Sequence, residues 1–204
     1  MTLKIFGDVV SPFVRMALVT AHEAGLNDRV ERLQAGVKPT EVNSDLQKLS
    51  PIAKVPVLVT EHAHAIHDSR VIMEYLAHVS GQSQFIPHDG VKRFHVLTLQ
   101  ATAQGMADAS VLLRYEQTQR PEEKRWPEYK TRLIQRIDAA LDDLEKNGGD
   151  VLADVNVGSI SAACAIGYID FRHAALDWRK GRSKLTQFFD GFSARASMQA
   201  YPLA

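Results

Sequence analysis

Apolar residues in the first 79 positions follow two spacings, one typical of strands and one typical of helices. Strands are predicted over residues 3–6, 29–33, 57–60 and 65–67, with the last two forming a hairpin. Helices are predicted over residues 12–24, 41–48 and 69–79, the first ending before Gly25. The last of these should turn five apolar residues inward: Val71, Ile72, Tyr75, Leu76 and Val79. The pattern indicates a small βαβ–ββα layer.

Beyond residue 90 the apolar spacing is helical throughout. Helices are predicted over residues 91–117, 122–146, 159–178 and 183–192. Residues 80–90 contain Gly81, Pro87 and Gly90 and are interpreted as a linker. We therefore expect an α/β domain over residues 1–79 and an all-helical domain over residues 91–204.

Composition narrows the classes of partner. The 204 residues carry 24 basic and 24 acidic side chains, and this zero net charge argues against a nucleic-acid binder that depends on a positive field. The N-terminus is too polar for a secretory signal, and no apolar run approaches the roughly 20 residues of a membrane span. The single Cys164 cannot form an internal disulfide, which favours a reducing cytoplasm. We expect a cytoplasmic protein with no nucleic-acid or membrane partner.

The tripeptide Ser11-Pro12-Phe13 follows the first predicted strand. Pro12 suits the first position of a helix, which makes Ser11 the N-cap residue. Its hydroxyl then lies beside free N–H groups at the positive end of the helix, where a thiolate is favoured. A hydrogen bond to the thiolate would lower the pKa of the thiol. The alternative is a structural cap without chemistry.

Two further motifs lie in the same half. The first is Val55-Pro56. If the bond between these residues is cis, the chain turns so that the Val55 N–H and C=O can pair with an extended peptide. If the bond is trans, this segment is an ordinary junction between a loop and a strand. Asp68 and Ser69 lie where a strand passes into a helix. The N–H and hydroxyl of Ser69 can bind a carboxylate, and Asp68 can pair with an ammonium group. The same residues can also cap the helix, because capping and ligand binding are compatible.

In this order the three motifs resemble those of the glutathione transferase superfamily, and the resemblance extends over essentially the whole chain. It is strongest to small bacterial members with a Ser-Pro-Phe-type first motif. The resemblance implies a thioredoxin-like N-terminal domain, an all-helical C-terminal domain and a homodimer. It also implies that glutathione is the co-substrate and that Ser11 stabilises its thiolate. The implied glutathione-binding residues are Phe13, Lys54, Val55, cis Pro56, Asp68 and Ser69.

The electrophile would bind between the two domains. Met106, Ser110, Leu113 and Arg114 recur on one face of the predicted helix 91–117, and with Val10 and Phe13 they are candidates to line that site. The alternative is that Met106 and Leu113 belong to the core and that Arg114 forms a surface ion pair.

Other polar residues have simpler interpretations. His62, His64 and His67 lie in the hairpin without a cysteine or acidic cluster to complete a tetrahedral site, so no metal is expected. Cys164 lies among alanines in a helix and is interpreted as a buried thiol. The family usually has a Ser/Thr-x-x-Asp capping box at the start of the buried helix. Here Ser159 can cap, but the acidic partner is absent.

These features predict a transferase that conjugates glutathione to a small electrophile, with a role in detoxification. Ser11 in place of a thiol disfavours reduction through a mixed disulfide, although glutathione-dependent reduction or isomerisation would use the same pocket. The alternative is an interaction or regulatory protein that keeps the fold and has little catalytic activity.

Overall fold

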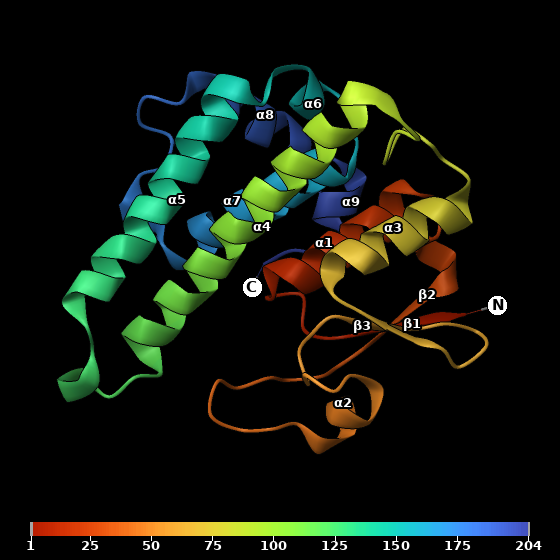
Figure 1. Ribbon diagram of the computed structural model, residues 1–204, viewed down its shortest axis with the longest axis horizontal. Helices are drawn as coiled ribbons and strands as arrows, with labels where there is room; N and C mark the ends of the chain where they lie inside the picture. Colours follow the sequence, from red (N-terminus) through yellow and green to blue (C-terminus); the bar gives the residue numbers. More distant parts are fainter. Residues whose placement is uncertain (1, 204) are drawn as a thin grey trace.

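A mixed four-stranded sheet organises the N-terminal part of the computed structural model, which describes residues 2–203 (Figure 1). Its strands lie in the order β2-β1-β3-β4: β2 (Val30–Leu33), β1 (Leu3–Phe6), β3 (Val57–Val59) and β4 (Ala65–His67). The pair β1–β2 is parallel, and the other two pairs are antiparallel. In β1 the side chains of Leu3 and Ile5 are buried while Lys4 is exposed, as an alternating strand requires.

Helices α1 (Pro12–Glu23) and α3 (Ser69–Ser80) lie between this sheet and the C-terminal helices (Figure 1). The short α2 (Ser44–Leu49) begins three residues later than predicted because the Asn43 side chain accepts a hydrogen bond from the Leu46 N–H and caps it. In α3, Ile72 and Leu76 are buried as expected. Val71 is 51% exposed, so its predicted inward orientation is wrong.

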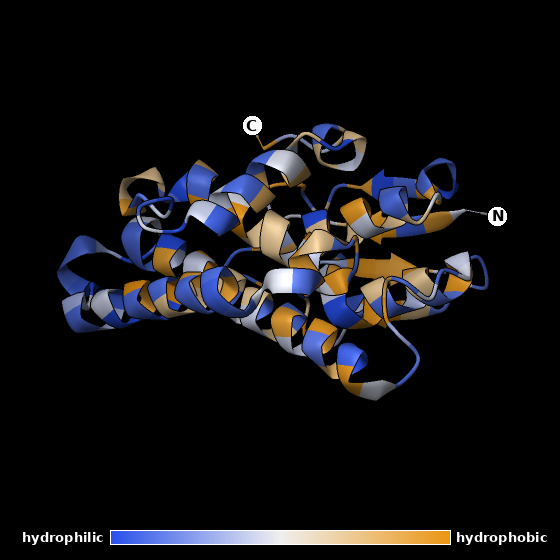
Figure 2. Cartoon of the chain, turned by 90° about the horizontal axis from the view of Figure 1, so that it is seen from above, coloured by the Kyte–Doolittle hydropathy of each residue, from blue (hydrophilic) through white to orange (hydrophobic). Residues whose placement is uncertain are grey.

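Helices account for the regular structure described beyond residue 89, as the spacing predicted. They are α4 (Gly90–Thr118), α5 (Pro127–Asn147), α6 (Gly149–Ala153), α7 (Val157–Arg172), α8 (Ser183–Ser193) and α9 (Ala196–Gln199). Short 3₁₀ turns cover Asn27–Arg29, Glu122–Lys124 and Ala174–Leu176. The predicted helix 122–146 therefore starts later, at Pro127, whose fixed φ suits a first helical position. Hydrophobic positions are interspersed among hydrophilic ones along most of these helices (Figure 2).

Helix α7 runs through the centre of the helical part, and each residue from Val157 to Ile169 is buried. Its start differs from the prediction, because Asn156 rather than Ser159 is the N-cap. The Asn156 Oδ1 accepts from the Gly158 and Ser159 N–H groups, and the Ser159 hydroxyl accepts from the Asn156 N–H. Ser159 therefore makes the return hydrogen bond that an acidic side chain makes in the usual motif, and the capping box is complete. The helix ends at Arg172, six residues before the predicted end.

Contacts between the helices show their relative directions. Gln82 donates to the Ala24 carbonyl, so α1 and α3 end side by side and run parallel. Ser69 contacts Gln104, and Met73 contacts Gln100, so α3 runs antiparallel to α4. Gly158 lies against the Val96 carbonyl, and His173 bonds to the Ser110 carbonyl, so α4 and α7 run parallel. The N-termini of α1 and α3 thus lie at the same end as the C-terminal halves of α4 and α7.

No helix in the range 2–203 combines the length and the apolar character that a bilayer span requires.

The cap of α7 should be a major determinant of stability. Asn156 is buried and its Nδ2 also donates to the carbonyls of Val151 and Asp154. Asn156→Ala should lower the free energy of unfolding by about 3 kcal/mol, because a cap and buried partners are lost together. The matched change Asn43→Ala, at the less buried cap of α2, should cost about 1 kcal/mol. Urea unfolding of both variants measures the difference, and equal costs would contradict this account.

His173 should make stability depend on pH. Its Nε2 donates to the Ser110 carbonyl at 2.9 Å, and burial lowers the pKa of the ring below its usual 6.5. Above pH 6.5 the ring is neutral in both states. Below it the unfolded chain binds a proton that the folded chain does not, so the free energy of unfolding falls until the folded pKa is reached.

His173→Gln keeps a donor for the Ser110 carbonyl and removes the titration. The stability difference between wild type and variant should therefore shift in favour of the variant as the pH is lowered from 7.5 to about 5.5. Urea unfolding at several pH values measures this shift. The exposed His62 supplies the control substitution, His62→Gln. Parallel curves for wild type and His173→Gln would refute the role of His173.

Candidate active site

Ser11 lies at the start of α1, with Pro12 at the first helical position, as expected. The turn before it is held by two hydrogen bonds to Asp8: the Ser11 N–H donates to its carbonyl and the Val10 N–H to its carboxylate, each at 3.0 Å. The Ser11 hydroxyl accepts from the Val14 N–H at a long 3.5 Å and is only half-buried. A loosely held hydroxyl at a helix N-terminus can donate to an anion that binds there.

Gly7 allows the segment before Ser11 to approach Val55. Its φ is +142°, a conformation that favours glycine. A Cβ at this position would overlap the Val14 side chain and lie 3.1 Å from the Val55 Cβ. The close approach at Gly7 therefore brings Val55 beside the first turn of α1.

The Val55–Pro56 bond is cis. Val55 precedes β3, and its N–H and C=O make no backbone hydrogen bond with another described residue. Lys54 beside it is exposed. An unpaired N–H and C=O at the end of a strand can receive an extended peptide as an added strand does.

Asp68 and Ser69 form the start of α3. Asp68 has a φ of +71° and its carboxylate accepts from Arg70 three times: from the N–H at 2.9 Å, from Nε at 3.2 Å and from Nη2 at 3.0 Å. These bonds hold the pKa of Asp68 below its usual value, so the group is an anion at neutral pH. It is half-exposed and retains lone pairs for a ligand ammonium group.

Two residues of α4 join this group, and neither is among those predicted from the sequence. Ser69 Oγ lies 3.1 Å from Nε2 and 3.2 Å from Oε1 of the buried Gln104. When the Gln104 amide donates, the Ser69 hydroxyl hydrogen remains available to a ligand carboxylate. The only sequence signal was a pair of glutamines, Gln100 and Gln104, on the inward face of a long helix.

Asp108, one turn after Gln104, is the second of these residues. The pKa of Asp108 is raised above its usual value, mainly because burial removes solvation from its carboxylate. The nearby carboxylate of Asp68 also raises this pKa, whereas the positive charges of Lys54 and Arg70 lower it. The charges of Lys54, Arg70 and Asp68 therefore act on the carboxyl group of Asp108. Asp68 and Arg70, an anion and a cation at the start of α3, can accept both charges of a zwitterionic α-amino-acid end.

The candidate residues for the electrophile divide into two groups. Val10, Phe13 and Arg114 are half-buried and accessible. Met106 and Ser110 are 1% and 0% exposed, and the Ser110 hydroxyl donates to the Met106 carbonyl within α4. The expectation that Met106 and Ser110 line an open site is therefore wrong, because their face of α4 packs against the core. Leu113 is buried in the same way.

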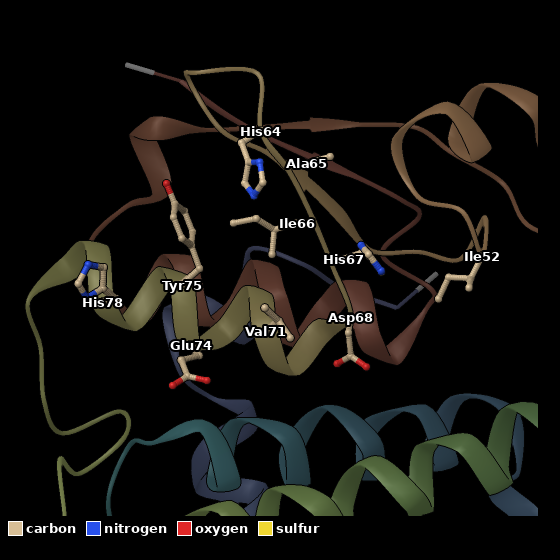
Figure 3. A pocket seen from close by; sticks show the side chains of 10 residues that line it. All are labelled: Ile52, His64, Ala65, Ile66, His67, Asp68, Val71, Glu74, Tyr75 and His78. Atoms are coloured by element: carbon tan, nitrogen blue, oxygen red, sulfur yellow. The ribbon is translucent and has the colours of Figure 1, made fainter.

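A groove of about 800 Å³ lies on the other side of Asp68, between β4 and α3 (Figure 3). It is lined by Ile52, His64, Ala65, Ile66, His67, Asp68, Val71, Glu74, Tyr75 and His78. Ser11 and Val55 are not among these residues. The groove therefore adjoins the α3 start of the site without containing the Ser11 hydroxyl.

Other reactive groups lie apart from this site. Cys164 is buried, and burial raises the pKa of its thiol to about 12, so it is protonated at neutral pH. No cluster of three or more metal-ligating side chains occurs in the part of the chain that the structure describes.

Comparisons with known proteins match both halves of the chain. Family models for the N-terminal and the C-terminal domain of glutathione S-transferase match residues 10–79 and 127–191. The chain is 31% identical to the uncharacterized GST-like protein YibF of Escherichia coli (strain K12). The matched region is 199 residues long and covers 96% of each sequence.

The fold is also similar to that of solved structures. A glutathione transferase family member from Pseudomonas fluorescens Pf-5 with bound glutathione is 37% identical, has a TM-score of 0.96 and covers 100% of both chains. A second crystal structure of a glutathione transferase family member from Pseudomonas fluorescens Pf-5, with bound S-(propanoic acid)-glutathione, is 37% identical, has a TM-score of 0.90 and matches over 98% of both chains.

Proposed function

Because the chain belongs to the glutathione S-transferase family, we propose that it binds reduced glutathione and transfers its thiolate to a small electrophile. The observation that carries this proposal is the grouping of Ser11, the unpaired Val55 backbone and the Asp68–Ser69 helix start at one end of the N-terminal part. The Pseudomonas relative with bound glutathione, which is similar over its full length, supports the same ligand.

In the proposed complex, glutathione lies extended between two helix starts. Its cysteinyl backbone pairs with the N–H and C=O of Val55, with cis Pro56 behind it. Its γ-glutamyl carboxylate accepts from the Ser69 N–H and hydroxyl, and its ammonium group pairs with Asp68. Lys54 approaches the glycyl carboxylate. Phe13, in the first turn of α1, packs beside the cysteinyl part.

The sulfur then lies at the N-terminus of α1, where Ser11 donates to it. This hydrogen bond favours the thiolate over the thiol, so it raises the reactive fraction at neutral pH. The bound thiolate attacks a soft electrophile held next to it, and proximity together with thiolate fraction supplies the acceleration. The relative that binds S-(propanoic acid)-glutathione supports a pocket that accepts glutathione with a substituted sulfur.

We also propose that the protein is a homodimer, as the family resemblance implies. Several large apolar side chains outside the core are available to a second copy. They are Ile52 and Val71, which line the groove beside α3, and Val91 and Phe94 at the start of α4, each more than half exposed.

Removal of the Ser11 hydroxyl should raise the pKa of the bound thiol. A hydrogen bond to a charged group is worth about 1.5–3 kcal/mol, so Ser11→Ala should raise this pKa by about 1–2 units. Ultraviolet titration of the enzyme-bound glutathione thiolate measures the shift. Ser11→Thr, which keeps a hydroxyl, is the matched control and should move the pKa less. An unchanged pKa in Ser11→Ala would show that another group stabilises the thiolate.

Asp68→Asn should weaken glutathione binding about tenfold or more. Asparagine still caps α3 and accepts from the Arg70 N–H, so the fold is retained while the charge that holds the ligand ammonium group is lost. Calorimetric titration with reduced glutathione measures the change, with Asp45→Asn on the exposed face of α2 as control. Equal affinities would refute the role of Asp68. No binding by the wild type would favour the interaction protein instead.

A further inference from the structure

A small pocket at the connection between α4 and α5 lies apart from the candidate active site. Its volume is about 240 Å³, and it is lined by Glu116, Gln117, Arg125, Trp126, Pro127 and Lys130. The groups around Ser11, Val55 and Asp68 include none of these residues. In Figure 1 this connection lies at the edge of the helical part, away from the sheet. The pocket is therefore a further concave site with chemistry of its own.

The backbone around this pocket is fixed by a buried carboxylate. Glu116 Oε1 accepts from the Trp126 N–H at 2.7 Å, and its Oε2 accepts from Arg120 Nε at 2.6 Å. These two bonds hold the pKa of Glu116 below its usual value, so the group is an anion at neutral pH. Arg125 Nε also donates to the Arg120 carbonyl, at 3.3 Å. The connection is thus braced at several points, and Trp126 is held in one place.

Trp126 presents its ring to solvent from this braced segment. The residue is 62% exposed, and its ring stacks on that of Tyr129 with the centroids 6.0 Å apart and an angle of 27° between the planes. Tyr129 in turn packs against the core, so the indole is supported by the body of the protein. Tryptophan is a frequent anchor where ligands and partners bind. A fixed indole at the wall of a pocket offers a stacking face to another aromatic ring.

Two side chains of the lining supply positive charge. Neither Arg125 nor Lys130 forms an ion pair with a carboxylate within residues 2–203. The one acidic residue of the lining, Glu116, is already bonded through both oxygens and is paired with Arg120. Three other acidic residues of this segment do not line the pocket: Glu122, Glu123 and Glu128. The pocket therefore combines an aromatic wall with an excess of positive charge, which complements an aromatic anion.

We propose that this pocket binds planar aromatic carboxylates of one or two rings, at a site separate from glutathione transfer. The ligand ring stacks on Trp126, and its carboxylate pairs with Lys130 and with the Nη groups of Arg125. Drug-sized ligands occupy pockets of about 300–1,000 Å³, so the smaller volume here limits the ligand to a small ring system. The site uses neither Ser11 nor bound glutathione, and the inference therefore does not depend on the proposed function.

The chain has two tryptophans, which makes a test specific to this pocket possible. Trp178 is buried and donates its Nε1–H to Asp170, so its indole signal should not respond to a ligand at Trp126. In two-dimensional ¹H–¹⁵N correlation spectra, indole-3-acetate should shift the indole N–H signal of Trp126, which Trp126→Phe identifies by its loss. The Trp178 signal should stay in place in each variant, which also shows that the fold is retained.

The neutral amide of the same probe measures the contribution of charge. Exposed ion pairs are weak, so the Trp126 signal of the wild type should report a three- to tenfold preference, roughly, for indole-3-acetate over indole-3-acetamide. The double variant Arg125→Gln/Lys130→Gln should bind the two probes equally. Lys124→Gln, an exposed lysine of the same segment outside the lining, is the matched control and should keep the preference.

Three results would overturn the inference. The first is a Trp126 signal that millimolar indole-3-acetate leaves unchanged, and the second is equal affinity of the wild type for the two probes. The third is a preference that survives in Arg125→Gln/Lys130→Gln. These measurements contain no glutathione, so their failure leaves the proposed function as it stands. Failure of the protein to bind glutathione would equally leave this inference in place.

Discussion

The antiparallel packing of α3 against α4 is the constraint on which the candidate site depends. Ser69 contacts Gln104, and one turn further along both helices Met73 contacts Gln100. Because α1 runs beside α3 in the same direction, both helices of the N-terminal part point their positive ends at the C-terminal halves of α4 and α7. An anionic peptide bound at these two helix starts would therefore lie beside the helical domain.

The elements near the site follow from local sequence, and several of them could be predicted. Pro12 and Gly25 mark the start and the end of α1, and the structure has both in these places. The hairpin β3–β4 follows from alternation on each side of a polar turn. The start of α7 was misplaced, because Asn156 and Ser159 form a capping box in which serine takes the place of an acid. That partnership depends on a hydroxyl rather than on a charge, and the usual motif does not include it.

The parts of the site that were missed come from tertiary contacts. Gln104 and Asp108 lie on α4, far from the motifs in sequence, and only the packing of α4 against α3 brings them to Asp68 and Ser69. The packing of α4 against α7 buries Met106 and Ser110, which share a helical face with Arg114 but lie deeper in the core. Helical spacing identifies a face of α4 without showing how far the neighbouring helices cover it. The depth of each residue on that face therefore could not be read from the sequence.

A crystal structure of this protein with reduced glutathione is the most direct test of the central claim. The account predicts that the ligand sulfur lies within hydrogen-bond distance of the Ser11 hydroxyl and that the cysteinyl backbone pairs with the N–H and C=O of Val55. The γ-glutamyl end should lie at the start of α3, beside Asp68 and Ser69. A ligand bound in the groove between β4 and α3, or one whose sulfur points away from Ser11, would contradict it.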